Sequence, residues 1–309
     1  LMAEILQPKP NESIYDPTCG SGGMLVKCLD YLRNKGEEWQ SVQVFGQEVN
    51  GLTSSIARMN LYLNGVEDFS IVCADTLEHP AFLDGSHLRK FDIVLANPPY
   101  SIKEWNREKF MNDKWGRNFL GTPPQGRADY AFLQHIIASM NETQGRCAIL
   151  FPHGVLFRDE ELELRKKLVE MDILDCIIGL GANLFYNSPM EACILICNCS
   201  KANSKKNRVL MINAVNEVTR KNAESMLLAE HIQRIVNAYQ QNRELDGFSR
   251  IVSNDEIREK KFNLNISLYA YQSVLQDALT VSKEDAINVW ISSHSQCINE
   301  MDELIKLIK

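Results

Sequence analysis

Short apolar runs alternate with amphipathic segments along the first 200 residues of the chain. The runs are bounded by glycine, proline or polar turns, which is typical of strands inside a sheet. The segments between them repeat apolar residues every three or four positions, as helices do when one face packs on a sheet. The pattern predicts strands at residues 13–15, 42–45, 71–77, 93–96, 147–151, 173–178 and 192–197. It predicts helices at residues 24–33, 52–63, 129–140 and 160–170.

Strands that alternate with helices in this way predict an α/β fold with a mostly parallel, doubly wound sheet. The pattern changes beyond Lys201, where a strand-like stretch at residues 209–212 is mixed with helical segments. We therefore expect an α/β domain over residues 1–200, a mixed α/β to helical extension over residues 201–270, and a C-terminal amphipathic helix over residues 271–309.

The last of these parts carries apolar residues at alternating spacings of four and three, which indicates a coiled-coil seam. The seam positions are Ile287, Ile291, His294, Ile298, Met301, Ile305 and Ile308. A polar residue such as His294 weakens a seam but sets its register. Two interpretations remain open, since the helix can pack on its own domain or dock on a helix of a partner.

The most informative stretch covers residues 92–101 and reads Asp-Ile-Val-Leu-Ala-Asn-Pro-Pro-Tyr-Ser. Its double proline must end the apolar strand abruptly, because Pro98 and Pro99 have fixed φ and no N–H to donate. The Asn97 side chain and the Pro98 carbonyl are thus rigidly held hydrogen-bond acceptors, which suit a planar amine. Tyr100 offers a flat face for a base that has been extruded from a duplex. The plainer interpretation is a strand followed by a proline turn.

A glycine-rich loop follows the first strand and reads Asp-Pro-Thr-Cys-Gly-Ser-Gly-Gly at residues 16–23. A strand, a glycine-rich turn and a helix in this order place backbone N–H groups against a nucleotide-like ligand. Glycines let the chain approach that ligand without interference from Cβ atoms. Glu48 follows the second strand, where nucleoside-binding folds place an acceptor for ribose hydroxyls. The alternative for Glu48 is an exposed carboxylate at the start of a helix.

Asn97-Pro98-Pro99-Tyr100 resembles the catalytic motif of amino-group methyltransferases. Nearly the whole chain resembles the modification subunit of type I restriction-modification systems, a family of adenine-N6 DNA methyltransferases. The resemblance implies an S-adenosylmethionine-dependent methyltransferase fold whose final strand runs antiparallel, with the catalytic domain at residues 1–200. The implied reaction methylates the N6 amine of an adenine that is flipped out of double-stranded DNA.

The same resemblance assigns catalysis to the four motif residues and S-adenosyl-L-methionine binding to the preceding loop and two later carboxylates. The implied cofactor residues are Asp16, Gly20, Ser21, Gly22, Gly23, Glu48 and Asp75. In the family, the residue at Asp16 contacts the methionine end of the cofactor and the residue at Asp75 lies near its adenine amine. An N-cap is an equally simple interpretation of Asp75. The implied chemistry needs no metal.

The charge of the chain bears on its partners. The net charge is −7 and the pI is about 5.5, which is the wrong sign for a protein that grips DNA unaided. The basic cluster at Lys201, Lys205, Lys206 and Arg208 could contact DNA, but its composition favours a solvated loop. The resemblance implies that a specificity subunit, docked through the C-terminal helix, recognises the DNA, and that a restriction subunit joins the full complex.

Composition and cysteine usage indicate a cytoplasmic protein. Hydrophobic residues make up 45% and charged residues 24%, as in soluble globular proteins, and no apolar run reaches the length of a membrane span. The nine cysteines are scattered and odd in number, which favours reduced thiols. Because Leu1 precedes Met2, we expect a piece of a longer protein, and in the family a helical domain and a further cofactor-contacting motif precede this region.

Two other functions are compatible with the motif. Protein glutamine N5-methyltransferases carry a similar one, but their smaller chains lack an equivalent of residues 200–309. A non-catalytic assembly subunit would keep the fold with a degenerate cofactor site, whereas Asp16, Gly20, Glu48 and Asn97 are intact here. His135 is not expected to be catalytic, because nothing pairs it with a nucleophile.

Overall fold

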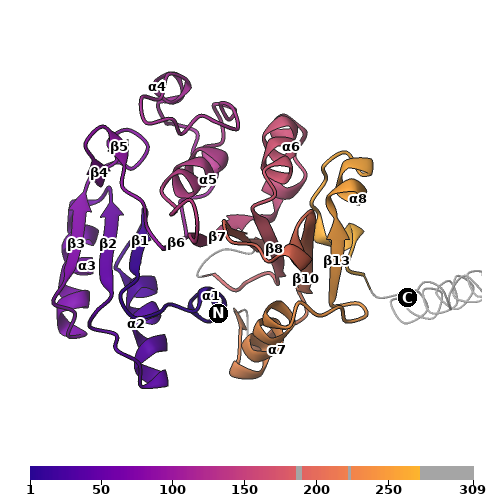
Figure 1. The fold of residues 1–309 in the computed structure, drawn as a ribbon, viewed down its shortest axis with the longest axis horizontal. Coiled ribbons are helices and arrows are strands. Elements are labelled where there is room, and N and C mark those ends of the chain that lie inside the picture. Colours follow the sequence, from indigo (N-terminus) through magenta and orange to yellow (C-terminus); the bar gives the residue numbers. More distant parts are fainter. Residues whose placement is uncertain (186–189, 222–223, 272–309) are drawn as a thin grey trace, which may run out of the picture. The chain divides into compact units, whose positions relative to one another are not determined.

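A sheet of nine strands runs through the computed structural model, which describes residues 1–185, 190–221 and 224–271 (Figure 1). The order of its strands is β13-β10-β8-β9-β7-β6-β1-β2-β3. Their bounds are β1 (Ser13–Asp16), β2 (Gln43–Glu48), β3 (Phe69–Cys73), β6 (Ile93–Ala96), β7 (Arg146–Pro152), β8 (Leu174–Leu180), β9 (Ala192–Asn198), β10 (Arg208–Ala214) and β13 (Ser249–Ser253). Two separate hairpins pair β4 (Leu83–Asp84) with β5 (His87–Leu88) and β11 (Thr219–Lys221) with β12 (Glu224–Met226).

Most neighbouring strands of the sheet are parallel. The exceptions are β9, which is antiparallel to β7 and β8, and β13, which is antiparallel to β10. The mostly parallel α/β sheet predicted from the sequence is therefore confirmed, and so is an antiparallel strand at residues 192–197. Strand β10 pairs in parallel with β8, so residues beyond 200 add two strands to the same sheet. The predicted helix with its coiled-coil seam lies outside the described residues.

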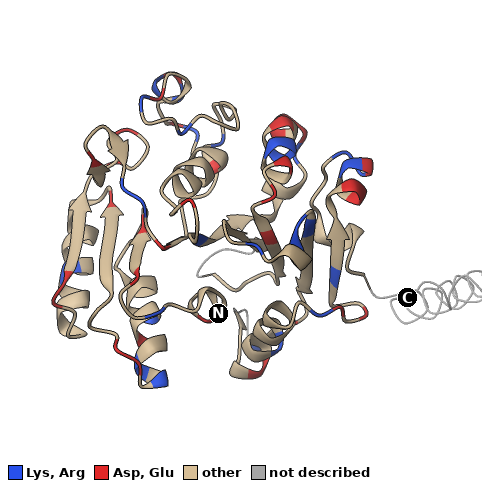
Figure 2. Cartoon of the chain, in the orientation of Figure 1, with Lys and Arg blue, Asp and Glu red and all other residues tan. Residues whose placement is uncertain are grey.

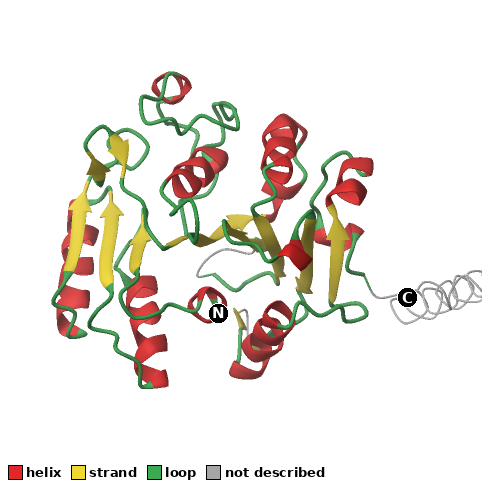
Figure 3. Cartoon of the chain, viewed as in Figure 1, coloured by secondary structure: helices red, strands yellow, loops and turns green. Residues whose placement is uncertain are grey.

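Helices cover both faces of the sheet, as Figure 3 shows by secondary structure. One face carries α1 (Met2–Leu6), α2 (Gly23–Lys35), α3 (Gly51–Leu63) and α7 (Ala229–Gln240). The other carries α5 (Asp129–Ala138), α6 (Leu162–Glu170) and α8 (Asn254–Glu259). Alternation along β7 explains both layers, because Ala148 and Leu150 pack with the first group of helices while Cys147 and Ile149 pack with the second. The described residues also form four 3₁₀ helices, η1 (His153–Leu156), η2 (Asp159–Glu161), η3 (Asn203–Lys205) and η4 (Ile266–Leu268).

The polar stretch between β6 and α5 contains the short helix α4 (Arg107–Met111). The Asn106 side chain caps α4 by accepting a hydrogen bond from the Lys109 N–H at 3.0 Å. Phe110 is buried, and its ring packs against Trp105 with the centroids 5.7 Å apart. Phe110 also belongs to a small hydrophobic cluster with Ala131 and Phe132, so the stretch packs against α5.

The helices of the described residues include none that is long and apolar enough to span a membrane. Every cysteine that the structure describes is a free thiol.

Candidate active site

The candidate site lies where the order of the strands reverses. The chain passes from β1 to β2 and β3, and it then crosses to β6 on the other side of β1. In open α/β sheets, ligands bind at such a point, outside the carboxyl ends of the strands. Asp16 is the last residue of β1, and Asn97 directly follows β6, which is parallel to β1. The fold thus brings the glycine-rich loop and the Asn97 motif to one end of two adjacent strands.

Asp16 is fully buried, and only one of its two carboxylate oxygens has a hydrogen-bond partner among the described residues. Its Oδ1 accepts a hydrogen bond from the Thr18 N–H at 2.9 Å, whereas its buried Oδ2 has no partner among the described residues. Burial raises the pKa of this carboxyl to about 7, and the nearby charge of Glu48 adds to the rise. Buried polar atoms almost always have a partner, so this oxygen fits the ammonium group of a ligand.

The glycine-rich loop bends away from Asp16 through left-handed backbone. Gly20 has φ +54° and Gly22 has φ +76°, a region that side-chain-bearing residues rarely adopt. A Cβ atom on Gly20 would meet no other atom within 4 Å, so the loop borders open space there. The Ser21 carbonyl accepts a hydrogen bond from the Asn60 amide at 2.9 Å, which ties the loop to α3.

Glu48 joins the glycine-rich loop to the start of α3. Its Oε2 accepts from the Gly20 N–H at 3.0 Å, and its Oε1 accepts from the Asn50 N–H at 2.8 Å. The structure therefore brings Glu48 and Gly20 together, as a shared ligand site requires. The cap of α3 is supplied by Asn50 itself, whose side chain accepts from the Thr53 N–H.

Asp75 follows β3 and is exposed. Its Oδ1 accepts from the Leu77 N–H at 2.8 Å and from the Glu78 N–H at 3.0 Å, so it closes a turn, and no helix begins there in the described structure. Asn97, Asp16, Glu48 and Asp75 nevertheless lie at the carboxyl ends of β6, β1, β2 and β3, in the order of these strands across the sheet. The sequence-predicted carboxylates and the amide therefore share one edge.

The Asn97 motif forms the turn that leaves β6. Asn97 and Pro99 are exposed, Pro98 is buried, and Tyr100 is half-buried. The Tyr100 hydroxyl donates a hydrogen bond to Asn97 Oδ1 at 2.9 Å. Burial raises the pKa of Tyr100, which keeps this hydroxyl protonated and able to donate. The acceptor oxygen of Asn97 is thus accessible, with a donor already on it.

Sequence reasoning missed the residues that hold this turn. Ser101 has φ +49°, and its N–H donates to Asp129 Oδ1 at 2.9 Å. Asp129 is buried, and its Oδ2 accepts from Arg158 at 2.9 Å. An acidic residue at the start of a helix has an ordinary explanation in the helix dipole, so the sequence gives no signal of this pairing.

A cavity of about 1090 Å³ opens on the face of the sheet that carries α2 and α7. Its lining includes Met24 and Lys27 of α2, the apolar pair Leu184 and Phe185, and Asn97. The volume of the cavity exceeds that of ordinary small-molecule sites. None of the candidate cofactor carboxylates is among the described residues that line it. It therefore adjoins the motif rather than coinciding with the predicted cofactor site.

The described residues contain no group of three or more His, Cys, Asp or Glu side chains placed to hold a metal ion.

The chain belongs to the N-6 DNA Methylase family, which matches residues 1–278. It is 34% identical over 282 residues to the Type I restriction enzyme MjaVIII methylase subunit of Methanocaldococcus jannaschii, a match that covers 87% of this chain and 47% of that protein. It is 30% identical over 280 residues to the Type I restriction enzyme MpnII methylase subunit of Mycoplasma pneumoniae, which covers 87% and 50%. The chain spans about half the length of these curated relatives.

Solved structures agree with this assignment. The crystal structure of a type I restriction-modification system methyltransferase subunit from Streptococcus thermophilus matches with a TM-score of 0.79 and 36% identity, over 87% of this chain and 57% of that one. A putative class I S-adenosylmethionine-dependent methyltransferase from Listeria monocytogenes shares the fold, with a TM-score of 0.58, 20% identity, and coverage of 77% of this chain and 66% of that one. The family and the methyltransferase fold predicted from the sequence are thereby confirmed, and S-adenosyl-L-methionine is the cofactor that both indicate.

Proposed function

We propose that the protein containing this chain transfers a methyl group from S-adenosyl-L-methionine to the N6 amine of adenine in double-stranded DNA, as the modification subunit of a type I restriction-modification complex. The observation that carries the proposal is the juxtaposition of Asn97 with Asp16 at the reversal point of the sheet. The named relatives, which are type I methylase subunits, support the same function.

The Asn97 motif supplies what the amine needs. An adenine amine is a poor nucleophile, because its lone pair is delocalised into the ring. Acceptance of its hydrogens by Asn97 Oδ1 and the Pro98 carbonyl favours the tetrahedral nitrogen that develops in the transition state, which is differential stabilisation. The Tyr100 ring would stack on the flipped base and fix its plane. The Tyr100 hydroxyl takes one of the two lone pairs of Asn97 Oδ1, and the other is left for the amine.

The carboxylates and the loop would orient the cofactor, which supplies an electrophilic methyl group on its sulfonium. Asp16 Oδ2 would accept the ammonium of the methionine moiety, while Glu48 would accept the ribose hydroxyls. Asp75 would lie near the adenine ring of the cofactor. Ser21, Gly22 and Gly23 would enclose the methionine moiety, and the bound cofactor would supply its methyl group to the N6 nitrogen, which would release a proton to solvent.

The charges of the described residues favour a partner for DNA binding. Lys201, which is buried, donates to Asp172 at 2.8 Å, and Lys205 bonds to Asp175 at 3.2 Å. Part of the basic cluster therefore has a structural role, and basic and acidic residues are mixed along α6 and α8 (Figure 2). We propose that a specificity subunit, docked through residues 271–309, supplies DNA affinity and sequence recognition. A restriction subunit would complete the complex, and the complex would act on DNA in the cytoplasm.

The test is to express the full-length gene, with and without its specificity subunit, in cells that lack adenine methylation, and to sequence their DNA for N6-methyladenine. We expect modification at one bipartite motif, only when both subunits are present. Modification without the partner would place a recognition element in this protein. Unmodified DNA from cells in which both subunits are soluble would contradict the proposal and favour a non-catalytic assembly subunit or protein glutamine methylation.

A further inference from the structure

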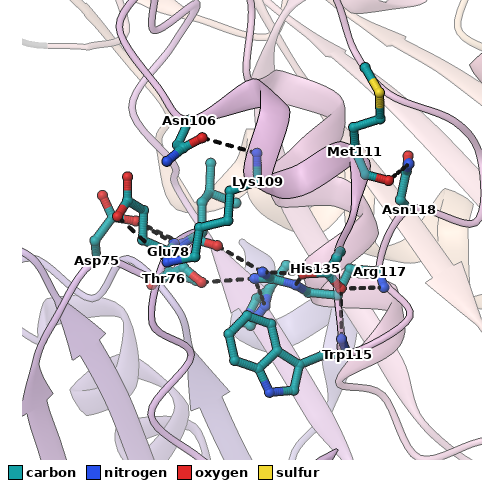
Figure 4. A network of polar contacts seen from close by, with 12 residues as sticks. Asp75, Thr76, Glu78, Asn106, Lys109, Met111, Trp115, Arg117, Asn118 and His135 are labelled. Atoms are coloured by element: carbon teal, nitrogen blue, oxygen red, sulfur yellow. Dashed lines mark hydrogen bonds and ion pairs between the residues drawn. The ribbon is translucent and has the colours of Figure 1, made fainter.

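A buried polar network lies beneath the carboxyl ends of β1, β2 and β3, with Arg117 at its centre (Figure 4). Arg117 is 1% exposed and comes from the segment between β6 and α5. A guanidinium has five N–H donors, and all of those on Arg117 have an acceptor. Its Nε and Nη2 donate to Asp113 Oδ1 at 3.0 and 2.6 Å, and Nη2 also donates to the Leu77 carbonyl at 2.7 Å. Its Nη1 donates to the Thr76 carbonyl at 2.9 Å and to His135 Nδ1 at 3.3 Å.

The network continues from His135 to the first two strands. Because Arg117 can only donate, His135 Nδ1 accepts and Nε2 carries the hydrogen, which faces the Tyr15 hydroxyl at 3.1 Å. The Tyr15 hydroxyl donates in turn to Gln47 Oε1 at 3.4 Å. Burial, followed by the charge of Arg117, lowers the pKa of His135 well below its usual 6.5, in agreement with a neutral ring.

Three members of this network are chain neighbours of the candidate cofactor carboxylates. Tyr15 precedes Asp16, Gln47 precedes Glu48, and Thr76 follows Asp75. Consecutive residues of a strand point to opposite faces of the sheet. The network is therefore placed behind the carboxylates of β1 and β2, on the face where α5 packs.

The turn at Asp75 is held from two sides. Its side chain accepts from the Leu77 N–H, while Arg117 holds the carbonyls of Thr76 and Leu77. The Thr76 hydroxyl also donates to the Pro17 carbonyl at 2.5 Å, at the start of the glycine-rich loop. The position of the Asp75 turn relative to this loop thus depends on a residue in the segment that follows the catalytic motif.

We propose that Arg117 is a positioning residue for cofactor binding, which fixes the Asp75 turn and couples the segment after the Asn97 motif to the S-adenosyl-L-methionine site. The inference rests on the proposed function. Only a planar fork of donors can reach a carboxylate, two carbonyls and an imidazole at once, since lysine offers three donors at a single point. The charge of the residue is therefore less important than its geometry.

The test compares Arg117→Lys with Arg107→Lys by calorimetric titration of S-adenosyl-L-methionine and by steady-state methylation with the specificity subunit present. Arg107 is a matched control, because it lies in the same segment and, among the described residues, its side chain bonds to the Pro123 carbonyl alone, at 2.8 Å. We expect Arg117→Lys to weaken cofactor binding by about tenfold or more, and Arg107→Lys to change it by less than about twofold. The KM for the cofactor should rise in Arg117→Lys while kcat at saturating cofactor stays within about threefold. A merely unstable protein would instead lose kcat.

A second measurement on the unmutated protein decides the question even if Arg117→Lys does not fold. Hydrogen exchange should show that the cofactor protects backbone amides at residues 113–117 together with those at residues 74–79. An unchanged affinity in folded Arg117→Lys, or protection of residues 74–79 alone, would overturn the inference. Failure of the unmutated full-length protein to bind S-adenosyl-L-methionine would overturn the proposed function itself, and this outcome is distinguishable from the others.

Discussion

Tyr15 and Asp16 are adjacent in β1, but their side chains lie on opposite faces of the sheet and differ in how far their polar atoms are hydrogen-bonded. The Tyr15 ring stacks on Phe91 with the centroids 4.5 Å apart, and its hydroxyl joins the network of Arg117 and His135. Asp16, on the other face, keeps one buried oxygen without a described partner. An unpaired buried polar group costs about 1–3 kcal/mol, a cost that the fold carries at Asp16 and avoids at Tyr15. We call Tyr15 and its hydrogen-bonded network the closed side of the site, and Asp16, the glycine-rich loop and Asn97 its open side.

The largest expected effect concerns Asn97, which lies on the open side of the site. Asn97→Ala should lower methyl transfer by about 10²–10³-fold, because the amine loses an acceptor aimed at its transition state. Cofactor affinity should change little, since Asn97 is not among the cofactor residues. The measurement is transfer of labelled methyl groups to DNA, with calorimetry as the control. Activity comparable to that of the unmutated protein would remove Asn97 from the mechanism.

The next effect is a pH dependence of cofactor affinity. The carboxyl of Asp16 has a pKa raised to about 7 by burial, so it is mostly protonated at pH 5.5 and mostly ionised at pH 7.5. Because only the ionised form attracts an ammonium, S-adenosyl-L-methionine should bind about tenfold more tightly at the higher pH. Titration calorimetry across this range measures the effect. Affinity that falls with rising pH over the same range would contradict the assigned role.

Tyr15→Phe tests the closed side. The change leaves the Nε2–H of His135 without its partner, so we expect the free energy of unfolding to fall by about 1–3 kcal/mol. Gln47 Oε1 keeps its hydrogen bond from the Ala81 N–H at 3.1 Å, which limits the loss of stability. Urea denaturation measures the change in stability, and cofactor affinity should stay within about threefold. Unchanged stability with strongly weakened binding would place Tyr15 on the binding side instead.

Tyr100→Phe has the smallest expected effect. It removes the hydroxyl that donates to Asn97 Oδ1 and keeps the flat ring, so the rate of methyl transfer should stay within about threefold. The matched variant Tyr100→Ala removes the ring and should lower the rate by about tenfold or more, because base stacking contributes about 1–3 kcal/mol. Equal losses in the two variants would show that the hydroxyl, rather than the ring, is required.

The open side of the site was predictable from the sequence, whereas the closed side was not. Asn97 and the glycine-rich loop each follow an apolar run directly, so local pattern predicts both the strand and the candidate residue after it. Arg117 stands in a polar stretch that resembles a solvated loop. Its bond to Thr76 spans 41 positions, and the bond between Tyr15 and His135 spans 120. No local pattern encodes such contacts.

The strands of the sheet, too, were predictable only where a local sequence pattern indicates them. The strands that alternate with helices up to residue 200 have local signals, and the structure contains them. The pairing of β10 with β8 and β13 was not foreseen, because strand pairing depends on neighbours that are distant in sequence. Helix ends also differ, since the segment expected to be helical from residue 160 begins as η2 and becomes α6 at Leu162.

The most direct test of this account is the affinity for S-adenosyl-L-methionine of Asp16→Asn compared with Asp175→Asn. Asp175 is a matched control, because it is also a buried carboxylate with one unpaired oxygen, but its Oδ2 bonds to Lys205 and Tyr239. At pH 7.5, calorimetry should show binding weakened by about tenfold or more in Asp16→Asn, because the proposed charge-assisted hydrogen bond to the cofactor would be lost, and little changed in Asp175→Asn. Equal affinity in both variants and the unmutated protein would contradict the claim that the open carboxylate of β1 binds the cofactor.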